Sequence, residues 1–489
     1  MLIETLEKRG AKSALLQNNR VIEAGALARD AKALAGALAR RTLGEGDRIA
    51  LLLPNCKELA LALLACGRLG SIAAPLDPAV TAPELARSLQ VLAPKCIFLL
   101  GRQMRTLEAA LGSAGLSPPL VVRIDQDLEG ALATDDESVQ LELLLEEGSP
   151  CPAGPPERAA FLAHMVHRGR GAPHFAVRSA DAVLEGAVLA ARATGLIDAR
   201  AETSQPVLAA APFFRPGALE LEVVAPLALG VPIAVLKQLR AGVALKLARV
   251  HGVRSIIGPP ALLGLMARIV AGGEPAPEGV RLCVATSAPP PPPAQAEEIE
   301  RAFQASLVWG YSPPEAPWAL AVSEERRALP PAARGLGDPV GDVSVALVQD
   351  GVEGATGEIH VRSRRAAREL LGERTADRPT PLGMPTGDRA VRLPDGTLKL
   401  LPREDVATVA AYEVDLAEVS EALRRHPAVA LAQAAAIPDP ELGNHVRAVV
   451  TLAPGGEASV AELVDFLRGS LAYYKIPHSF RFRRLGRPE

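Results

Sequence analysis

Arginine and histidine side chains gather in one short stretch of the chain. Val166–Phe175 has the sequence VHRGRGAPHF, in which the guanidinium groups of Arg168 and Arg170 could bind an anion such as a phosphate. His164 and His167 have the His-x-x-His spacing that would place two imidazoles on one face of a helix, as at a zinc site. No carboxylate or cysteine lies at a supporting spacing, so we expect no metal site.

The overall composition is that of an ordinary globular protein. The chain has 489 residues, of which 48% are hydrophobic and 22% charged, and this length predicts two or three domains. The 53 basic and 56 acidic residues give a net charge of −3, so there is no basic excess to hold nucleic acid by counterion release. The five cysteines form no C-x-x-C pair and indicate buried thiols in a reducing compartment.

No segment has the properties of a secretory signal or a membrane span. The N-terminal segment carries acidic side chains and lacks a long apolar stretch. The two most apolar segments, Leu59–Ala74 and Val223–Leu236, are interrupted by Arg68 and by two prolines. Neither reaches the roughly 20 uninterrupted apolar residues that a membrane span requires. We therefore expect a cytoplasmic protein.

Helix and strand patterns alternate along the first hundred residues. Short apolar runs that end at turn residues are typical of buried strands, and apolar residues at helical spacing are typical of helices. The alternation predicts a parallel, doubly wound sheet. The expected helices are Ala24–Arg41, Glu58–Leu69 and Glu84–Leu92, and the expected strands are Arg48–Leu53, Ser71–Pro75 and Cys96–Leu100.

The rest of the chain divides into regions of different character. Residues 112–160 are rich in Gly, Pro, Asp and Glu, and we interpret them as a connecting or surface region. From about Gly335, apolar and polar residues alternate as in antiparallel strands with one solvated face. The predicted fold is α/β: residues 1–404 form a large N-terminal region of packed doubly wound sheets with a barrel-like part. Residues 405–489 form a small, mobile C-terminal α+β domain.

Short motifs occur in a consistent order over nearly the whole chain. They are Gly46–Asn55, Gly70–Pro78, Pro212–Gly217, Gly335–Pro339, Gly357–Arg362, Thr386–Asp388, Asp395–Gly396, Arg403–Asp405, His426–Val429, Ile437–Gly443 and Tyr474–Pro477. In this order and at this spacing, the chain resembles the adenylate-forming superfamily of acyl- and aryl-CoA synthetases, peptide-synthetase adenylation domains and luciferase.

The resemblance implies a specific chemistry. Members activate a carboxylate with ATP to form an acyl-adenylate, and a thiol, often that of coenzyme A, takes the acyl group after the small domain rotates. Asp388 falls where the family binds the ribose hydroxyls, a role that suits a carboxylate because it accepts from both hydroxyls of a diol. Arg403 falls where an arginine helps to hold the nucleotide, and Asp405 falls at the hinge. The alternative for Asp388 is a structural role in capping a turn.

The family's aromatic and hydroxyl motif is partly kept. Trp309–Glu315 (WGYSPPE) is similar to Tyr-Gly-x-Thr-Glu, which supplies an adenine-stacking ring, a phosphate-contacting hydroxyl and a magnesium carboxylate. Trp309 can stack and Ser312 keeps the hydroxyl, so both are candidates for the nucleotide site. Pro313 replaces the metal carboxylate, and Glu315 lies two residues late. Since Mg²⁺ requires near-ideal octahedral geometry, magnesium binding is doubtful.

The phosphate loop of the family is altered in this chain. Val166–Phe175 lacks the hydroxyls that would donate to phosphate, and His174 and Phe175 replace the family's lysine and closing glycine. Backbone N–H groups approach an anion closely where residues are small, so the bulk of Phe175 is expected to change this geometry.

The motifs of the small domain depart from the family as well. The lysine and glycine that approach coenzyme A are replaced within the run Val406–Ala411, where one residue is missing. The family's C-terminal catalytic lysine has no counterpart in the sequence that ends at Glu489, and Lys475 matches a different, structural motif.

These departures predict an acyl-CoA synthetase-like protein in which adenylation is lost or weakened. The expected ligands are a small carboxylic acid or acyl thioester, with weak ATP or AMP binding and coenzyme A as a candidate thiol. Arg215 stands where the family often has histidine and could pair with a ligand carboxylate, unless it is solvated or structurally paired. Two other hypotheses stay open: an active acid–thiol ligase, and a pseudoenzyme that binds a ligand, a carrier or another partner protein.

Overall fold

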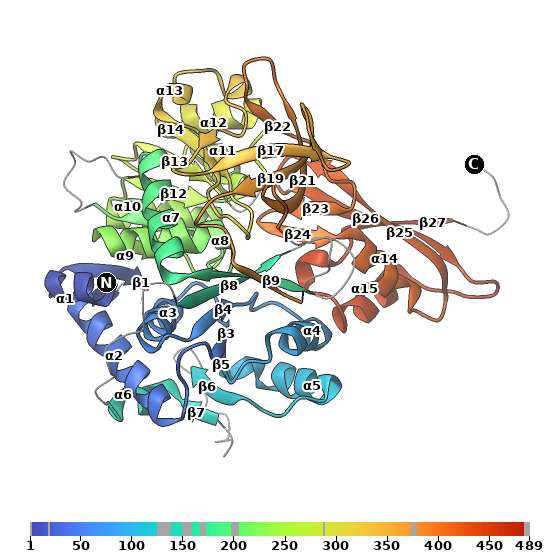
Figure 1. Cartoon of the computed structure of the whole chain (residues 1–489). Coiled ribbons are helices and arrows are strands. Elements are labelled where there is room, and N and C mark those ends of the chain that lie inside the picture. The colour runs from blue at the N-terminus through green and yellow to red at the C-terminus, as the bar shows by residue number, and fades with distance from the viewer. Residues whose placement is uncertain are drawn as a thin grey trace.

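The computed structural model describes residues 2–17, 20–124, 138–148, 159–166, 173–196, 205–286, 289–372 and 379–483. Within these ranges the strands form two large sheets, a smaller five-stranded sheet, and a separate sheet near the C-terminus. Figure 1 shows the C-terminal part, coloured orange to red, lying beside the two large sheets. The α/β fold class is therefore confirmed.

The eight-stranded sheet contains the elements expected from the first hundred residues. Its central strands run parallel and are buried, which explains their nearly continuous apolar sequences. These strands are β3 (Arg48–Leu52), β4 (Ile72–Pro75), β5 (Cys96–Leu100) and β6 (Leu120–Ile124). The helices between and around them are α2 (Ala24–Arg40), α3 (Lys57–Leu69), α4 (Ala82–Leu92) and α5 (Met104–Ala114).

The interpretation of residues 112–160 as a connecting or surface region is wrong for part of that stretch. β6 pairs with β5, and its Val122 is fully buried. β7 (Ser138–Gln140) forms one edge of the sheet, and α6 (Leu141–Glu146) packs two leucines into the core. The short apolar runs were concealed because Gly, Pro, Asp and Glu dominate the residues around them.

His164, the first histidine of the His-x-x-His spacing, lies on a strand, and His167 lies outside the described residues. β8 (Ala160–Val166) pairs antiparallel with β9 (His174–Ser179) in the eight-stranded sheet. His164 is buried in β8, where burial, together with two nearby arginine charges, lowers its pKa to about 3. The imidazole is therefore neutral near pH 7. In the part of the chain that the structure describes, no group of three or more His, Cys, Asp or Glu could hold a metal ion.

The nine-stranded sheet is parallel through its middle and forms the second large layer. Its strands are β1 (Ser13–Gln17), β2 (Arg20–Glu23), β10 (Val207–Ala209), β11 (Ile233–Val235), β12 (Ser255–Gly258), β13 (Leu282–Ala285), β14 (Ser306–Tyr311), β15 (Leu320–Ala321) and β16 (Asp338–Pro339). Its helices include α1 (Leu2–Arg9), α7 (Ala180–Ala193), α8 (Pro216–Ala218), α9 (Ala225–Leu229), α10 (Ala241–His251), α11 (Pro260–Ala271) and α12 (Pro293–Phe303). Ligands of such sheets bind beyond the carboxyl ends of the parallel strands. In this sheet, the strand ends that concern the site are those of β13 and β14.

The five-stranded sheet is antiparallel, as the alternating sequence predicts. It comprises β17 (Ser344–Gln349), β18 (Val352–Glu353), β19 (Thr356–Arg362), β21 (Met384–Arg392) and β22 (Leu398–Leu400). A separate strand from the same region, β20 (Glu369–Leu371), pairs with β9 of the eight-stranded sheet.

The C-terminal unit, defined here as residues 406–483, has a hydrophobic core of its own. Its elements are β23 (Val406–Val409), β24 (Tyr412–Asp415), α14 (Leu416–Arg424), β25 (Val429–Asp439), β26 (Gly443–Leu452), α15 (Val460–Arg468) and β27 (Ser479–Arg483). The division of the chain at residues 404 and 405 stays a prediction, which this separate core supports.

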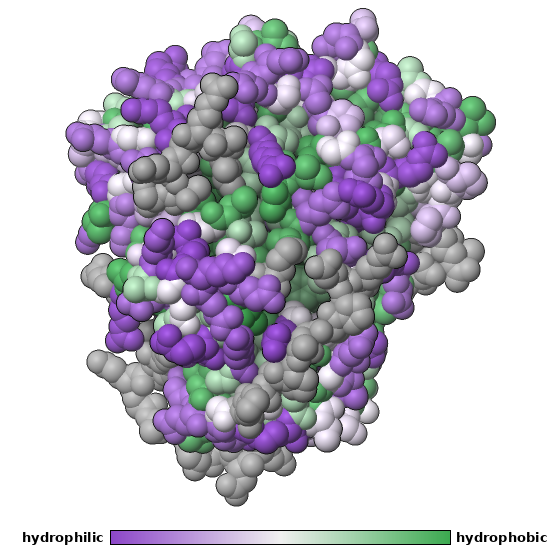
Figure 2. All heavy atoms as spheres, turned by 60° about the vertical axis from the view of Figure 1, so that its left-hand side comes forward, coloured by the Kyte–Doolittle hydropathy of each residue, from purple (hydrophilic) through white to green (hydrophobic). Residues whose placement is uncertain are grey.

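The molecular surface is mainly hydrophilic on the face drawn in Figure 2, where hydrophobic side chains are visible mostly towards the middle. Among the described helices, none is long and apolar enough to cross a membrane.

Gly357 in β19 tests how tightly the five-stranded sheet is packed. A Cβ at this position would lie 2.5 Å from the Val348 carbonyl oxygen of β17, where only backbone surrounds it. We expect Gly357→Ala to lower the free energy of unfolding by about 1–3 kcal/mol in a denaturant titration. Gly354→Ala is the matched control, because its nearest neighbouring atom lies at 3.9 Å. Equal effects of the two substitutions would contradict this description of the sheet.

Candidate functional site

A cavity of about 1440 Å³ lies between the C-terminal unit and the rest of the chain. The strand ends of the nine-stranded sheet and β21 supply one wall, and β24 and α14 supply the opposite wall. The residues predicted from the sequence to bind ligands all line this cavity, namely Arg215, Trp309, Ser312, Asp388 and Arg403.

Two side chains hold the Asp388 carboxylate, the Tyr311 hydroxyl and the Arg403 guanidinium. The Tyr311 hydroxyl donates to Asp388 Oδ2 over 2.8 Å, and Arg403 Nη1 lies 3.8 Å from Asp388 Oδ1. Burial raises the pKa of Tyr311 well above its usual value, and the charge of Asp388 adds to this shift, so the phenol stays a donor. The sequence interpretation missed Tyr311, because it occupies the variable position of the Trp309–Glu315 motif.

Arg403 connects the cavity with the start of the C-terminal unit. Its Nη2 lies 3.1 Å from Asp405 Oδ2, in addition to its approach to Asp388. A hydrogen bond from Arg403 is the main cause of the lowered pKa of Asp405. The predicted hinge residue is therefore tied directly to the predicted nucleotide residues.

Trp309 and Ser312 line the cavity at the end of β14, and hydrogen bonds hold both side chains in place. The Trp309 indole N–H donates to the Gly335 carbonyl over 2.8 Å, and the guanidinium carbon of Arg334 lies 5.6 Å from its ring centroid. The Ser312 hydroxyl accepts from the Trp318 backbone N–H over 3.1 Å. Trp309 is buried, so an adenine that stacked on it would meet only the part of the ring that faces the cavity.

The candidate magnesium carboxylate is buried and does not line the cavity. Glu315 is fully buried, and its backbone carbonyl accepts from the Ala367 N–H over 2.7 Å. Pro313 lines the cavity at the position where the family has its metal-binding glutamate, and Glu315 is absent from the cavity wall in the described ranges. The two-residue displacement therefore moves the carboxylate out of the site.

The altered phosphate loop is described only at its edges. Arg168, Arg170 and His167 lie outside the described residues. At the start of β9, His174 lines the cavity while Phe175 is fully buried in the core of the eight-stranded sheet. The expectation that Phe175 changes the geometry of this loop stays a prediction, because residues 167–172 lie outside the described ranges.

Arg215 precedes α8 and pairs with the C-terminal unit. Its Nη2 lies 2.8 Å from Glu413 Oε1 on β24. Arg215 is therefore paired within the protein, which was one of the alternatives considered from the sequence. Its role in binding a ligand stays a prediction.

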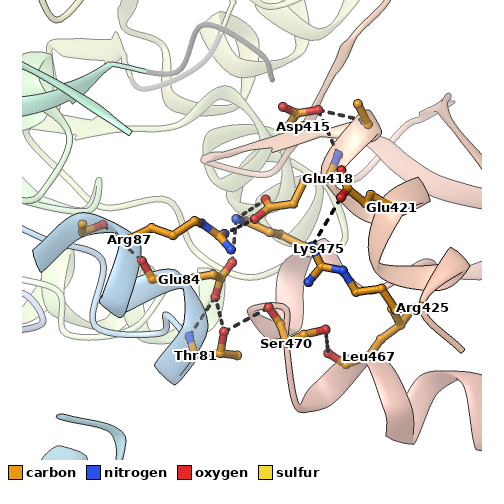
Figure 3. A network of polar contacts seen from close by, with 12 residues as sticks. Thr81, Glu84, Arg87, Asp415, Glu418, Glu421, Arg425, Leu467, Ser470 and Lys475 are labelled. Carbon is orange, nitrogen blue, oxygen red and sulfur yellow. Dashed lines mark hydrogen bonds and ion pairs between the residues drawn. The ribbon is translucent and has the colours of Figure 1, made fainter. Parts of the chain in front are cut away.

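A second set of contacts joins the C-terminal unit to α4, and we call it the clasp. Lys475 Nζ lies 2.6 Å from Glu84 Oε1 and 2.7 Å from Glu418 Oε2, and Arg87 also pairs with Glu418. The Thr81 hydroxyl donates to the Ser470 carbonyl over 3.1 Å. Figure 3 shows these side chains converging between α4 and the C-terminal unit.

The charges of the clasp stabilise one another. Burial by itself would lower the pKa of Lys475, but the charges of Glu418 and Glu84 outweigh burial and raise it. Burial would likewise raise the pKa of Glu84, yet the charge of Lys475 lowers it. Lys475 and Glu84 are therefore both ionised at neutral pH.

An aromatic stack continues from the clasp toward Arg215. The rings of Tyr474 and Tyr412 are stacked with centroids 4.1 Å apart, and Phe214 lies 6.2 Å from Tyr412. The Tyr474 hydroxyl donates to Asp77 Oδ2 over 2.5 Å. Tyr474, Phe214 and Asp77 each lie in a motif identified from the sequence, but nothing in the sequence indicated that they would meet or that Tyr412 would join them.

Two family models match the chain. The model described as AMP-binding enzyme matches residues 2–371, and the model described as AMP-binding enzyme C-terminal domain matches residues 418–485. A sulfoacetate–CoA ligase of Cupriavidus necator is 28% identical over 476 residues, which cover 94% of this chain and 88% of that protein. A long-chain-fatty-acid–CoA ligase of Bacillus subtilis is 25% identical over 491 residues, covering 93% and 85% of the two chains.

Solved structures with the same fold cover almost the whole chain. An amide bond synthetase from Marinactinospora thermotolerans has a TM-score of 0.83 at 22% identity, covering 99% of this chain and 95% of that one. A malonyl-CoA ligase with methylmalonyl-CoA and AMP bound has a TM-score of 0.78 at 24% identity, covering 98% and 97%.

The clasp is tested by Lys475→Gln, which leaves two carboxylates close together without their shared cation. We expect this change to lower the free energy of unfolding by about 3–5 kcal/mol, the cost typical of breaking a buried ion pair. Arg87→Gln removes a more exposed partner of Glu418 and is expected to cost only about 0.2–1 kcal/mol. Thermal or denaturant unfolding measures both variants.

The loss of stability caused by Lys475→Gln should depend on pH. The pKa of Glu84 is lower in the folded chain, so its contribution is present above its unfolded value, about 4.3, and is lost as pH falls further. The stability difference between wild type and Lys475→Gln should therefore shrink in acid. A difference that is small at neutral pH, or that grows in acid, would contradict the clasp.

Proposed function

Because this chain belongs to the AMP-binding enzyme family of adenylate-forming proteins, we propose that it binds a carboxylic acid and a nucleotide in the cavity described above. It is an acyl-CoA synthetase-like protein whose adenylation is absent or weak, with coenzyme A as its candidate thiol. The observation that carries the proposal is the gathering of the four nucleotide-site candidates and Arg215 around one cavity.

Nucleotide binding is supported by the arrangement around Asp388. A carboxylate that is fixed by Tyr311 and lies beside Arg403 is preorganised to accept from a ribose diol, and the guanidinium of Arg403 has the donor geometry that suits oxyanions. Ser312 lies on the same wall and carries a hydroxyl that can donate to a phosphate.

Weak adenylation is supported by what surrounds these groups. Pro313 offers no ligand atom to a metal, and the Glu315 carboxylate is buried away from the cavity. His174 takes the place of the lysine that the family loop carries. Loss of one preorganised charge-stabilising group costs on the order of 10²–10³ in rate, so the departures together leave little turnover.

An active acid–thiol ligase is the second candidate function. It is favoured by the relatives that match over nearly the whole chain, whose names specify CoA ligases. The acids in those names range from sulfoacetate to long-chain fatty acids, so the names do not fix the acyl group for this chain.

Pyrophosphate release with a panel of carboxylic acids, ATP and Mg²⁺ distinguishes the two candidates. We expect turnover well below the ordinary enzyme range of about 1–10³ per second for every acid. Rates within that range for any acid would establish the active ligase and overturn the weak-adenylation proposal. Ligand binding with no pyrophosphate at all would leave a binding protein.

The nucleotide assignment is tested by Asp388→Ala in an AMP or ATP titration. We expect affinity to fall about tenfold or more, because the ribose hydroxyls lose their charged acceptor. Asp395→Ala is the matched control, since Asp395 bonds only to Thr397 in the hydrogen bonds of the described chain and stands outside the cavity wall. Unchanged affinity in Asp388→Ala would discard the ribose assignment.

A further inference from the structure

Several residues that line the cavity have a buried polar atom with no hydrogen-bond partner among the described residues. Two of these atoms, Arg215 Nε and Thr286 Oγ1, belong to the same wall. An N–H or O–H that is buried without a partner is costly, so each such group calls for a partner such as a water, an ion or a ligand group. These two atoms therefore indicate where a polar part of a ligand belongs.

The turn at Gly217 brings these groups to one side of the cavity. Gly217 follows Arg215 by two residues, and a Cβ on it would lie 3.3 Å from Thr286 Oγ1 and would overlap the Ser312 hydroxyl. Only glycine allows the three elements to approach this closely. Arg215, Thr286 and Ser312 consequently border the same part of the cavity.

Arg215 gives this wall a positive charge, which the Glu413 carboxylate balances from the opposite wall. Arg215 pairs with Glu413, which belongs to the C-terminal unit, and its Nε–H lies outside that pair. Arg178, a neighbouring buried arginine, already pairs with Glu220. His164 is neutral, since burial and then the charges of both arginines lower its pKa to about 3. Glu413 thus contributes an oxyanion in the position that a ligand oxyanion would take.

We propose that Arg215 and Thr286 form an anion subsite that binds a second anionic group, a carboxylate or sulfonate, on a short acid. The acid's other carboxylate then lies toward Ser312 and the nucleotide residues. The ligand class is therefore short dianionic acids, and the ligand anion competes with Glu413 for the guanidinium. This inference rests on the proposed function only in taking the cavity as the acid site.

Calorimetric titration of the full chain with length-matched acids tests the subsite without requiring turnover. The probes are succinate against butyrate and malonate against propionate, near neutral pH and without nucleotide. We expect each dianion to bind about tenfold or more tightly than its monoanion partner, because a charge-assisted pair is added. Arg215→Gln should abolish this preference, and Arg215→Lys should keep part of it.

Two further variants separate a ligand role from a structural one. Glu413→Gln should strengthen dianion binding, because it removes the competing carboxylate, whereas a merely structural pair would give weaker binding or none. Arg425→Gln is the control, since Arg425 also lines the cavity but lies on the C-terminal unit, paired with Glu421. The preference should survive in this variant. Thr286→Val is expected to weaken the dianions selectively, and it replaces Arg215→Gln if that variant does not fold.

The outcomes are distinct from those of the pyrophosphate assay. Equal binding of dianions and monoanions, no binding of either, or a preference that survives Arg215→Gln would overturn the subsite. A clear dianion preference in a chain that releases no pyrophosphate would support the subsite and count only against the active ligase. Pyrophosphate release confined to monoanionic acids would overturn the subsite and leave ligase activity standing.

Discussion

Lys475 is the point at which the C-terminal unit is fixed against the rest of the chain. Its ammonium is buried between Glu84, from α4, and Glu418, from α14, and its removal would leave Glu84 without its buried cation. The same contact places β24 opposite Arg215 and encloses the cavity between the two parts. Because a buried charge has few acceptable arrangements, this ion triad favours one position of the unit, which the Arg215–Glu413 pair and the Tyr474–Asp77 hydrogen bond also support.

The cavity combines features of a nucleotide site with features that disfavour phosphate transfer. Asp388, Tyr311 and Arg403 form a preorganised polar group, and Trp309 is anchored by its indole N–H. Glu315, by contrast, is buried and is not among the residues that line the cavity. These features support the proposal that the chain holds its ligands more readily than it activates them.

Much of the architecture could be predicted from the sequence because it is recorded in local patterns. Apolar runs of strand length identified β3, β4 and β5, and short motifs placed Asp388 and Arg403 at one site. Each of these signals is carried by residues that are close together in the chain.

The contacts that the sequence could not supply are long-range. Arg215 and Glu413 are 198 residues apart, and Lys475 and Glu418 are 57 residues apart, so no periodicity or spacing connects them. The face of β9 on which Phe175 lies likewise depends on the neighbouring strands, β8 and β20. Pairing of this kind is decided by tertiary packing and not by local propensity.

A crystal structure of the chain with AMP and succinate would test the central claim most directly. The account predicts AMP with its ribose hydroxyls at Asp388, and succinate with one carboxylate at Arg215 and the other toward Ser312. Nucleotide bound elsewhere, or a cavity that contains neither ligand at saturating concentrations, would contradict it.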